Sequence, residues 1–345
     1  MTQASVASRN NQRLIGPAAL LPVGLLAGVA ILVLGLAVSI TLGAAEIEVS
    51  TVFASIFQYD DTLFDHLIIR TVRLPRIIAG VIIGAALAVA GAIMQGLTAN
   101  PLASPGILGI NAGAAFAVVL GVFFLGSPPL LTYAFLAISG AGAAAVIVYT
   151  LGSVGRGGTT PVKLTLAGVI FSAFTAAFTT AILVLDRQTF DQIRFWTVGS
   201  IAGRDWELIA WMSPFIAIGT IGAMLMSRQI TTISLGQDIA QGLGQNTTRV
   251  RAISAIMVIL LAGASVGIAG PVGFVGLVIP HVVRAICGVD YRWIIPYSAV
   301  AGGILIVLAD SIGRIILRPQ EVPIGVMLAF VGAPFFIYLA RWKVR

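Results

Sequence analysis

Ten stretches of about 20 residues, each almost free of charged side chains, follow one another along this chain. A helix needs about 20 mainly apolar residues to cross the hydrocarbon core of a membrane. The stretches are continuously apolar rather than alternating, which excludes the strands of a membrane barrel. The sequence therefore predicts an all-α membrane protein with about ten transmembrane helices. The predicted spans are Leu14–Leu42, Ile77–Leu97, Gly106–Gly126, Pro129–Gly152, Leu164–Leu185, Glu207–Ser227, Ala252–Ala269, Pro271–Gly288, Ile294–Leu317 and Val322–Arg341.

The composition excludes a soluble protein. Only 10% of the 345 residues are charged and 58% are hydrophobic, whereas a soluble domain carries about 25% charged residues. So few charges cannot cover that much apolar side chain in water, and a disordered chain has the opposite composition. We therefore treat residues 1–345 as a single transmembrane domain. Its net charge of +7 is attributed to the basic cytoplasmic side of a membrane protein rather than to binding of nucleic acid.

Basic residues are unevenly distributed among the predicted connections. With both termini inside the cell, the cytoplasmic segments hold 12 basic and 2 acidic residues, and the outer segments hold 8 basic and 11 acidic residues. Lys and Arg collect on the cytoplasmic side, so this orientation is favoured. Residues 1–13 then form a cytoplasmic tail, and 228–251 form the longest cytoplasmic loop. The first span is expected to stay uncleaved, because its apolar run is about twice as long as the core of a signal peptide.

Motifs of catalysis and of metal binding are missing from the sequence. It has no G-x-x-x-x-G-K-[ST] phosphate loop, the device that holds ATP in many ATPases. The two histidines, His66 and His281, lie far apart in sequence, and the single cysteine, Cys287, cannot form a Cys-rich metal site. We expect a structural hydrogen bond for His281. Asp310 is the ionisable residue nearest to the middle of a span, and Arg314 one turn later can pair with it. We therefore expect no catalytic residue, metal or cofactor in this chain, and an energy source on another subunit if the chain transports.

A short amphipathic helix is predicted inside the cytoplasmic loop. Leu235, Ile239 and Leu243 recur every four residues, which is one stripe of a helix, and Gly244 is a suitable helix stop. Such a stripe must be covered by the protein's own loops, by the lipid surface or by a partner protein.

Glycine pairs spaced four residues apart occur within several spans. Glycine at this spacing lets the backbones of membrane helices approach closely, so a compact bundle is predicted. The pairs are Gly80 and Gly84, Gly109 and Gly113, and Gly263 and Gly267.

Three blocks of sequence, taken in their order and at their spacing, resemble the FecCD family of ABC-transporter permeases, which includes the vitamin B12 permease. The resemblance covers about residues 15–342, nearly the whole chain, and implies the architecture of a type II ABC-importer permease. The blocks consist of Arg73–Arg76 with Gly91–Gly106, then Leu235–Gly244, and then Gly270–His281 with Leu308–Arg314, Pro323–Gly325 and Gly332–Phe336.

The resemblance implies a function and a set of partners. It implies the permease subunit of an importer for a bulky iron–siderophore complex in the bacterial inner membrane. The implied partners are a second permease subunit, identical or paralogous, two ATP-binding cassette subunits that hold ATP and Mg, and a periplasmic or lipid-anchored substrate-binding protein. Cobalamin or haem remains an alternative cargo. An ATP-independent secondary transporter is the rival outside the family, and the lack of clustered mid-span His, Asp, Glu or Cys argues against an intramembrane enzyme.

The resemblance also assigns the amphipathic segment to contact with the ATPase. Gln237 and Asp238 depart from the family pattern, because two acidic residues are common there. The assigned coupling residues are Leu235, Gly236, Gln237, Asp238, Ile239, Ala240, Leu243 and Gly244.

Three arginines are assigned to the docking of the binding protein. Arg73, Arg76 and Arg314 fall on positions where the family's outer arginines meet acidic residues of that protein. Pro75 is suited to the first turn of a helix, so Arg73 and Arg76 are expected where the second span begins, on the outer face. The alternative is local pairing with acidic neighbours, which are Asp60, Asp61 and Asp65.

The fifth span is expected to line the translocation pathway, as it does in the family. Its hydroxyl residues Ser172, Thr175 and Thr179 are the candidates for this lining. The alternative is that each hydroxyl bonds a carbonyl of its own helix. Residues 192–201, which follow this span, resemble the family's short outer helix near the mouth of the pore.

Overall fold

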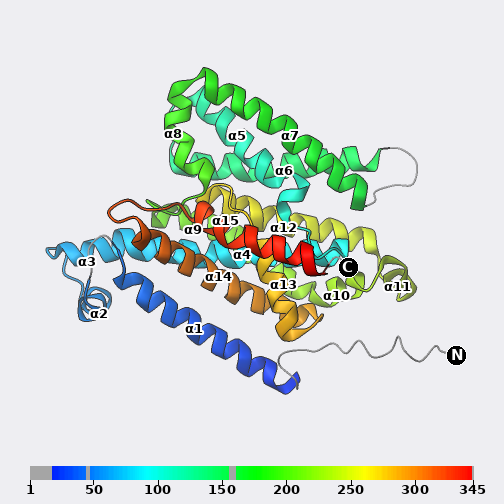
Figure 1. The fold of residues 1–345 in the computed structure, drawn as a ribbon, viewed down its shortest axis with the longest axis horizontal. Helices are drawn as coiled ribbons and strands as arrows, with labels where there is room; N and C mark the ends of the chain where they lie inside the picture. Colours follow the sequence, from blue (N-terminus) through cyan, green and yellow to red (C-terminus); the bar gives the residue numbers. More distant parts are fainter. Residues whose placement is uncertain (1–17, 44–46, 155–160, 344–345) are drawn as a thin grey trace.

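The computed structural model describes residues 18–43, 47–154 and 161–343, and these residues form helices and connections without any strand (Figure 1). The predicted tail 1–13 and the first residues of the predicted first span lie outside the described residues. The apolar helices that match the predicted spans are α1 (Leu21–Thr41), α4 (Leu74–Thr98), α5 (Ile110–Leu125), α6 (Leu130–Ser153), α7 (Pro161–Leu185), α9 (Trp206–Leu225), α12 (Thr247–Ala269), α13 (Val275–Cys287), α14 (Tyr291–Ile316) and α15 (Ile324–Lys343).

The all-α fold and the number of spans are confirmed. Among the described residues, seven helices are long and apolar enough to cross a membrane, and three more are apolar but shorter. The shorter elements between them are η1 (Ala18–Leu20), α2 (Val49–Phe57), α3 (Phe64–Ile68), η2 (Ile69–Arg73), η3 (Pro105–Leu108), α8 (Arg187–Val198), α10 (Ser227–Ser234) and α11 (Gln237–Gly242).

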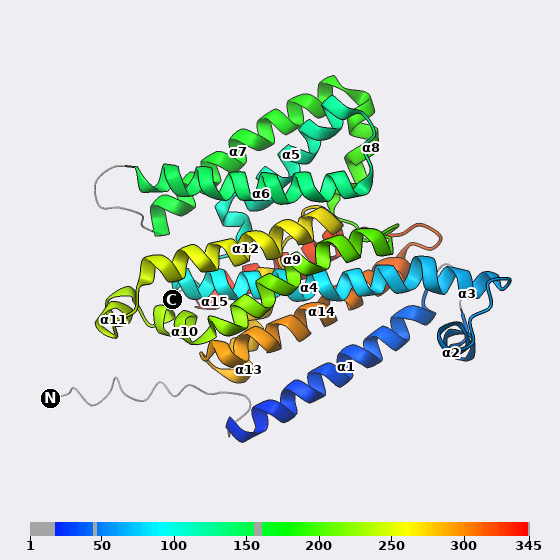
Figure 2. The same cartoon turned by 180° about the vertical axis from the view of Figure 1, so that it is seen from behind.

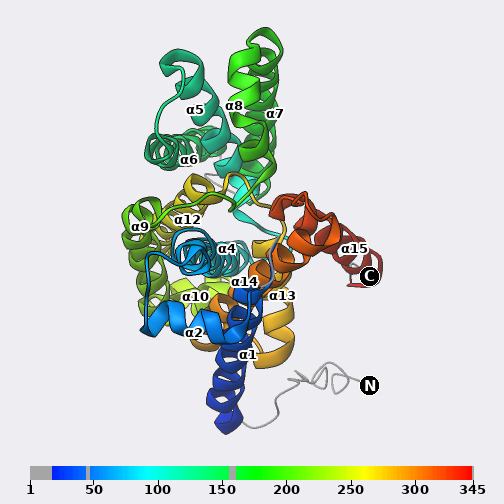
Figure 3. The same ribbon diagram turned by 90° about the vertical axis from the view of Figure 1, so that its left-hand side faces the viewer.

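Helix α4 lies at the centre of the bundle. It packs against α9, α12, α13 and α14, and 78% of its apolar stretch is buried. Helices α5, α6, α7 and α8 form a layer on one side of this core, as the end-on view shows (Figure 3). On the opposite side lies α1, of which only 11% is buried.

Helix α1 is held to the bundle mainly by α14. Tyr297 donates its hydroxyl to the carbonyl of Leu21 at 2.6 Å, and the hydroxyl of Ser311 donates to that of Ser39 at 2.9 Å. The first apolar helix is thus joined to one of the last by hydrogen bonds near both of its ends.

The bundle has two distinct ends. The start of α1, the end of α15 and the short helix α11 lie toward one of them, which we call the α11 end (Figure 2). Helices α2, α3 and α8 lie toward the other, which we call the α3 end. The N-terminus of the first apolar helix and the C-terminus of the last thus lie at the same end of the bundle, as an even number of spans requires.

Glycines allow the central helices to touch through their backbones. A Cβ atom on Gly91 would lie 2.0 Å from the carbonyl oxygen of Gly276 in α13, and one on Gly84 would lie 2.2 Å from that of Gly302 in α14. The close approach predicted for the glycine pairs is thus present at Gly84, and a Cβ on Gly113 would likewise lie 2.4 Å from the Cβ of Ala144 in α6. No side chain fits between these helices.

The second span begins earlier than predicted. Elements α3, η2 and α4 form one continuous apolar helix, Phe64–Thr98. Pro75 lacks an N–H and crowds the preceding turn. The helix accommodates it with a π-helical turn, in which the N–H of Leu74 donates to the carbonyl of Ile69. Arg73 and Arg76 therefore lie within the helix, and the expectation that they occupy its first turn is wrong.

The predicted break between the seventh and eighth spans is confirmed. Helix α12 ends at Ala269, and α13 begins at Val275. Because its first residues form the turn, α13 has only 13 residues, about 20 Å at 1.5 Å per residue. It is shorter than the hydrocarbon core of about 30 Å, so α13 alone does not reach across it.

Candidate functional site

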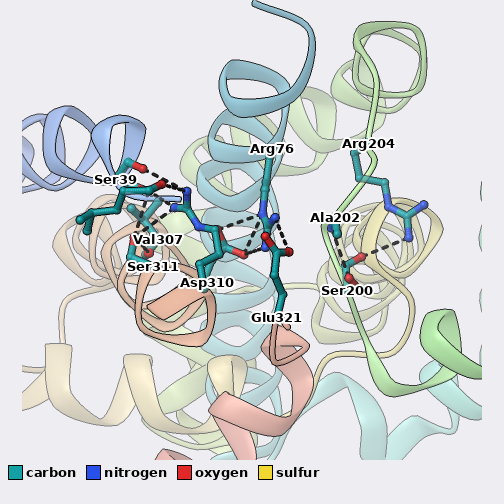
Figure 4. Close-up of polar contacts among 11 residues, drawn as sticks. Ser39, Arg76, Ser200, Ala202, Arg204, Val307, Asp310, Ser311 and Glu321 are labelled. Atoms are coloured by element: carbon teal, nitrogen blue, oxygen red, sulfur yellow. Dashed lines mark hydrogen bonds and ion pairs between the residues drawn. The ribbon is translucent and has the colours of Figure 1, made fainter. Parts of the chain in front are cut away.

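A buried network of charges occupies the α3 end of the bundle, close to the start of α4 (Figure 4). Arg76 donates from Nη2 to Asp310 Oδ1 at 2.8 Å and from Nε to both carboxylate oxygens at 3.1 and 3.2 Å. Its remaining nitrogen, Nη1, donates to Glu321 Oε2 at 2.7 Å. Arg76 and Asp310 are buried. The guanidinium of α4 thus joins α14 to the connection that precedes α15.

Arg314 extends this network to α1. Its Nε lies 3.0 Å from Asp310 Oδ2, so the pairing one helical turn apart that the sequence predicts is confirmed. Nη1 donates to the carbonyls of Ser39 at 3.1 Å and Leu42 at 2.6 Å. These carbonyls lie at the C-terminal end of α1, where an α-helix leaves its last carbonyls without partners. Arg314 therefore caps α1 while it neutralises Asp310.

Arg73 also caps the C-terminal end of α1. It is buried, and its Nη1 donates to the carbonyl of Ile40 at 2.6 Å. The three arginines predicted for docking are therefore brought together, but each guanidinium has partners within the chain. As a contact surface for the binding protein they remain a prediction.

For Arg76 and Arg314 the partners differ from those of the local alternative, whereas the carboxylate of Asp65 acts electrostatically on Arg73. Arg76 and Arg314 pair with Asp310 and Glu321 rather than with Asp60, Asp61 or Asp65. Asp60 instead accepts from the backbone N–H and the hydroxyl of Thr62 at 2.9 and 2.6 Å. These two hydrogen bonds lower the pKa of Asp60 below its usual range. The role of Glu321 was missed, because nothing local in the sequence connects it to a residue 245 positions earlier.

The predicted coupling segment, residues 235–244, protrudes at the α11 end. Helix α11 covers Gln237–Gly242, and its apolar stripe is uncovered, with Leu235, Ile239 and Leu243 exposed by 56%, 52% and 71%. Asp238 is also exposed. The Oε1 atom of Gln237 accepts from Arg251 Nη2 at 3.0 Å, which ties the segment to α12.

The inner side of the segment is firmly packed. Ala240 is fully buried and lies in a small apolar cluster with Ile233 and Val250. The predicted helix stop at Gly244 is confirmed: its φ is +78°, and its N–H donates to the carbonyl of Gln241 at 2.9 Å. The N–H of the next residue donates to the carbonyl of Ala240, also at 2.9 Å, which completes a Schellman motif. The segment is a fixed protrusion, and Ala240 belongs to its base rather than to its exposed face.

The predicted pathway residues lie on α7, at the edge of the α5–α8 layer (Figure 3). Thr175 is buried, and its hydroxyl donates to the carbonyls of Phe171 at 2.9 Å and Ser172 at 3.2 Å. Thr175 therefore follows the alternative, in which the hydroxyl bonds carbonyls of its own helix. Ser172 and Thr179 are half-buried. Their contact with cargo stays a prediction.

Helix α8 replaces the predicted short helix at residues 192–201 and begins five residues earlier, at Arg187. Asp186 caps it by accepting from the backbone N–H of Thr189 at 3.0 Å and from its hydroxyl. These hydrogen bonds lower the pKa of Asp186. The side chain of Asp186 thus marks the boundary between α7 and α8.

Two residues outside these clusters have other partners. The ring of His281 lies edge-on against that of Phe335, with centroids 5.8 Å apart. Gln95 accepts from Arg284 and donates to the carbonyls of Gly276 and Leu277 at 3.2 and 3.3 Å. Within the part of the chain that the structure describes, His, Cys, Asp and Glu side chains form no group of three or more that could hold a metal ion.

Comparison with known proteins gives concordant results. The model of the FecCD transport family matches residues 31–342. The chain is 45% identical to the iron(3+)-hydroxamate import system permease protein FhuB of Bacillus subtilis, over 93% of this chain and 83% of that protein. It is 42% identical to the Fe(3+)-citrate import system permease protein YfmD of the same organism, over 90% and 92%. It is 40% identical to the ferric enterobactin transport system permease protein FepD of Escherichia coli, over 91% and 94%.

A solved structure has the same fold. It is an inward-facing conformation of an ABC transporter assigned to the metal-chelate type. The match has a TM-score of 0.81 and 27% identity, and it covers 93% of this chain and 99% of that one. These relatives are transport permeases rather than enzymes. With the family model matched over residues 31–342 and relatives at 40% identity or more, this chain belongs to the FecCD transport family.

Proposed function

We propose that this chain is the permease subunit of a binding-protein-dependent ABC importer that moves a bulky iron–siderophore complex across the bacterial inner membrane. A second permease subunit, identical or paralogous, completes the pathway. Two partner subunits hydrolyse ATP with Mg, and a periplasmic or lipid-anchored protein delivers the cargo. The iron is cargo and not a resident cofactor of this chain.

The exposed stripe of the coupling segment is the observation that carries this proposal. Three large apolar side chains, Leu235, Ile239 and Leu243, protrude from a base that is packed around Ala240. Exposed apolar side chains on a rigid support favour burial in a groove of a partner protein. A rigid segment also transmits a push from that partner to α10 and α12, between which it lies.

The cargo is inferred from the relatives. The permeases named above belong to import systems for iron(3+)-hydroxamate, Fe(3+)-citrate and ferric enterobactin. Their shared feature is a ferric chelate, so a chelate of this kind is proposed here. Ser172, Thr175 and Thr179 of α7 remain the proposed lining of its pathway.

The docking of the binding protein involves the α3 end in this proposal. A carboxylate of that protein that reaches Arg76 competes with Glu321, whose side chain is 38% exposed at the rim of the network. Asp310 is only 2% exposed, so it stays on Arg76 and Arg314. Exchange of carboxylates at Arg76 needs no opening of the bundle.

Uptake of ⁵⁵Fe-labelled ferric hydroxamate tests the function. Cells that express the chain together with the binding protein and the ATPase of its import system should accumulate the label. Replacement of the phosphate-loop lysine of the ATPase should abolish uptake while the membrane potential stays intact. Uptake that continues in that variant and collapses with an ionophore would instead identify a secondary transporter.

A further inference from the structure

Helix α2 has one apolar face that is exposed at the α3 end. Its four large side chains recur at helical spacing and so share one face, and their exposed fractions range from 42% to 78%. They are Val49, Phe53, Ile56 and Phe57. The nine residues of α2 include no charged side chain. An exposed apolar face of this kind marks contact with a protein or with a membrane.

The other side of α2 fixes the helix to the bundle. Val52 and Ser55 are buried, and Val52 lies in an apolar cluster with Ile40 of α1. Arg70 of η2 donates from Nε to the carbonyl of Ser55 at 3.0 Å and from Nη2 to that of Ile56 at 3.2 Å. These carbonyls are among the last of α2, which have no partner within the helix. The fold therefore sets the direction in which the exposed face points.

Two observations place α2 at the level of a membrane surface. Helix α1 has 21 residues, about 32 Å at 1.5 Å per residue, which matches a hydrocarbon core of about 30 Å; α2 is the next helix after its end. Trp206, the first residue of α9, donates from Nε1 to the carbonyl of Arg70 at 3.0 Å. Tryptophan collects at membrane surfaces, so Arg70, which holds α2, lies at that level too.

Helix α2 also lies across the direction of the spans. Figure 1 shows α4 lengthwise and α2 nearly end-on, whereas Figure 3, turned by 90°, shows α4 end-on and α2 lengthwise. A helix that crosses the spans at the level of their ends lies in the plane of the membrane surface, as interfacial amphipathic helices do. It packs against α1, of which only 11% is buried, so its exposed face continues a surface that already faces lipid.

We propose that α2 is an interfacial anchor whose apolar face enters the lipid leaflet at the α3 end. Such a face is buried about 5–10 Å deep, at the boundary between headgroups and acyl chains. Because α2 carries no charge, the acyl chains are its partner rather than an anionic headgroup. The inference requires only that the chain spans a membrane, and it holds for any cargo or binding protein of the import system.

Nitroxide labels on the full chain in phosphatidylcholine nanodiscs test this contact. Cys287→Ala removes the one native cysteine, and Phe53→Cys and Phe57→Cys then place single labels on the face. Leu34→Cys is the lipid reference, because Leu34 is 65% exposed on the spanning helix α1. Phe64→Cys is the matched control in water: Phe64 is 73% exposed, and it begins α3, which extends farther from the α11 end than α2 does (Figures 1 and 2).

Power-saturation electron paramagnetic resonance measures what each label meets. Oxygen collides with labels in lipid, and a water-soluble nickel chelate collides with labels in water. The labels at Phe53 and Phe57 should have the high oxygen access and low nickel access of Leu34, and the label at Phe64 should have high nickel access. Nickel access on α2 equal to that at Phe64 would overturn the anchor. Low access to both reagents would show that a protein, such as a second permease copy, covers the face, and would overturn it as well.

The lipid composition tests the chemistry of the contact. Replacing part of the phosphatidylcholine by anionic phosphatidylglycerol should leave the access of both α2 labels unchanged, and so should added salt, because salt screens only charges. Access typical of lipid that appears only with the anionic lipid would overturn the assignment to acyl chains. Addition of the binding protein should likewise leave both labels unchanged, and a loss of oxygen access on its addition would assign the face to that protein instead.

Discussion

The carboxylate of Asp310 pairs with two guanidiniums in the interior of a membrane protein, and Glu321 supplies the second negative charge. Asp310 is 2% exposed, and both Arg76 and Arg314 depend on it. Removing one partner of a buried pair leaves an uncompensated charge, which costs about 3–5 kcal/mol. The cost arises from the charge that remains rather than from the bond that is lost.

Asp310→Asn should therefore lower the free energy of unfolding by about 3–5 kcal/mol. Asparagine keeps the shape of the side chain and removes only its charge. Unfolding in detergent, followed by loss of helical circular dichroism, measures the change. Asp191→Asn is the control, because its pair with Arg194 is exposed on both sides and contributes at most about 1 kcal/mol. Equal stability of the two variants would show that the buried charges do not need Asp310.

Gly91 gives a second test at the scale of one residue. Gly91→Ala places a Cβ 2.0 Å from the carbonyl oxygen of Gly276, so α4 and α13 must separate, and we expect a loss of about 1–3 kcal/mol. Gly35→Ala is the matched control, since a Cβ at Gly35 in α1 meets nothing within 4 Å; alanine favours the helix over glycine by about 0.5–1 kcal/mol, so stability should not fall. Thermal unfolding compares the two, and similar midpoints would contradict the backbone contact.

Local spacing predicted part of the charge network and missed the rest. Arg314 lies one helical turn after Asp310, so their pairing follows from helix geometry. Arg76 reaches the same carboxylate across 234 residues, and no local pattern indicates that contact. The misplaced start of the second span had a physical cause as well: Pro75 usually marks a first turn, but here a π-helical turn carries the helix past it. Reversal of the charge in Arg76→Glu would place a third carboxylate beside Asp310 and Glu321 and would disturb folding.

At the scale of elements, the coupling segment combines a packed base with an exposed face. Substituting Leu235, Ile239 and Leu243 together by serine removes only exposed apolar surface. The variant should keep its thermal stability and lose co-purification with the ATPase, since the stripe is what a partner groove would bury. Affinity purification from membranes that contain both subunits measures this loss.

Ala240→Leu is the contrasting variant. Ala240 is fully buried, so a larger side chain should destabilise the segment itself. The family resemblance includes Ala240 among the coupling residues, and its burial against Ile233 and Val250 assigns it to the base of the segment. If the triple serine variant still binds the ATPase as tightly as the unmodified chain, the segment does not couple the two proteins.

The cap of α8 adds a dependence on pH. The pKa of Asp186 is lowered in the folded protein by hydrogen bonds from Thr189. A lowered pKa means that the stabilisation is complete above the ordinary carboxyl pKa of about 3.9 and is lost as the pH falls through the folded value. Asp186→Asn should keep a capping oxygen and lose this dependence. Thermal midpoints of the two proteins between pH 3 and 7 should converge at the acidic end, and parallel curves would contradict the role of Asp186.

The length of an apolar run predicted that a helix forms more accurately than it predicted the residues at which the helix begins and ends. Ten apolar runs predict ten helices, because each run must by itself be long enough and apolar enough to cross the lipid. Where a run contains Gly and Pro, part of it forms a connection: α5 begins only at Ile110, after a 3-10 turn, and α13 only at Val275. Hydrophobicity does not distinguish these turns from helix, because their residues are uncharged and mostly apolar.

At the scale of the whole molecule, the charge asymmetry predicts which end of the bundle faces the cytoplasm. The α11 end holds the segment that the proposed ATPase contacts, and the first and last apolar helices have their outer termini there. A periplasm-active reporter fused after Arg345 should be inactive, and one inserted after Asp61, between α2 and α3, should be active. Measured enzyme activity in intact cells, normalised to fusion protein, gives the answer. Activity of the fusion at Arg345 would contradict the proposed orientation and place the C-terminus outside the cell.

The attachment of α1 to α14 has a consequence for biosynthesis. Ser39 and Ser311, which join the two helices, are 272 residues apart. A ribosome adds about 5–20 residues per second, so α1 waits about 14–54 s in the membrane before α14 is made. During that time lipid is its main surrounding, and α1 has the highest mean hydropathy of the seven long helices described, 2.7. Its sequence suits a helix that must be inserted and stable alone long before the bundle exists to receive it.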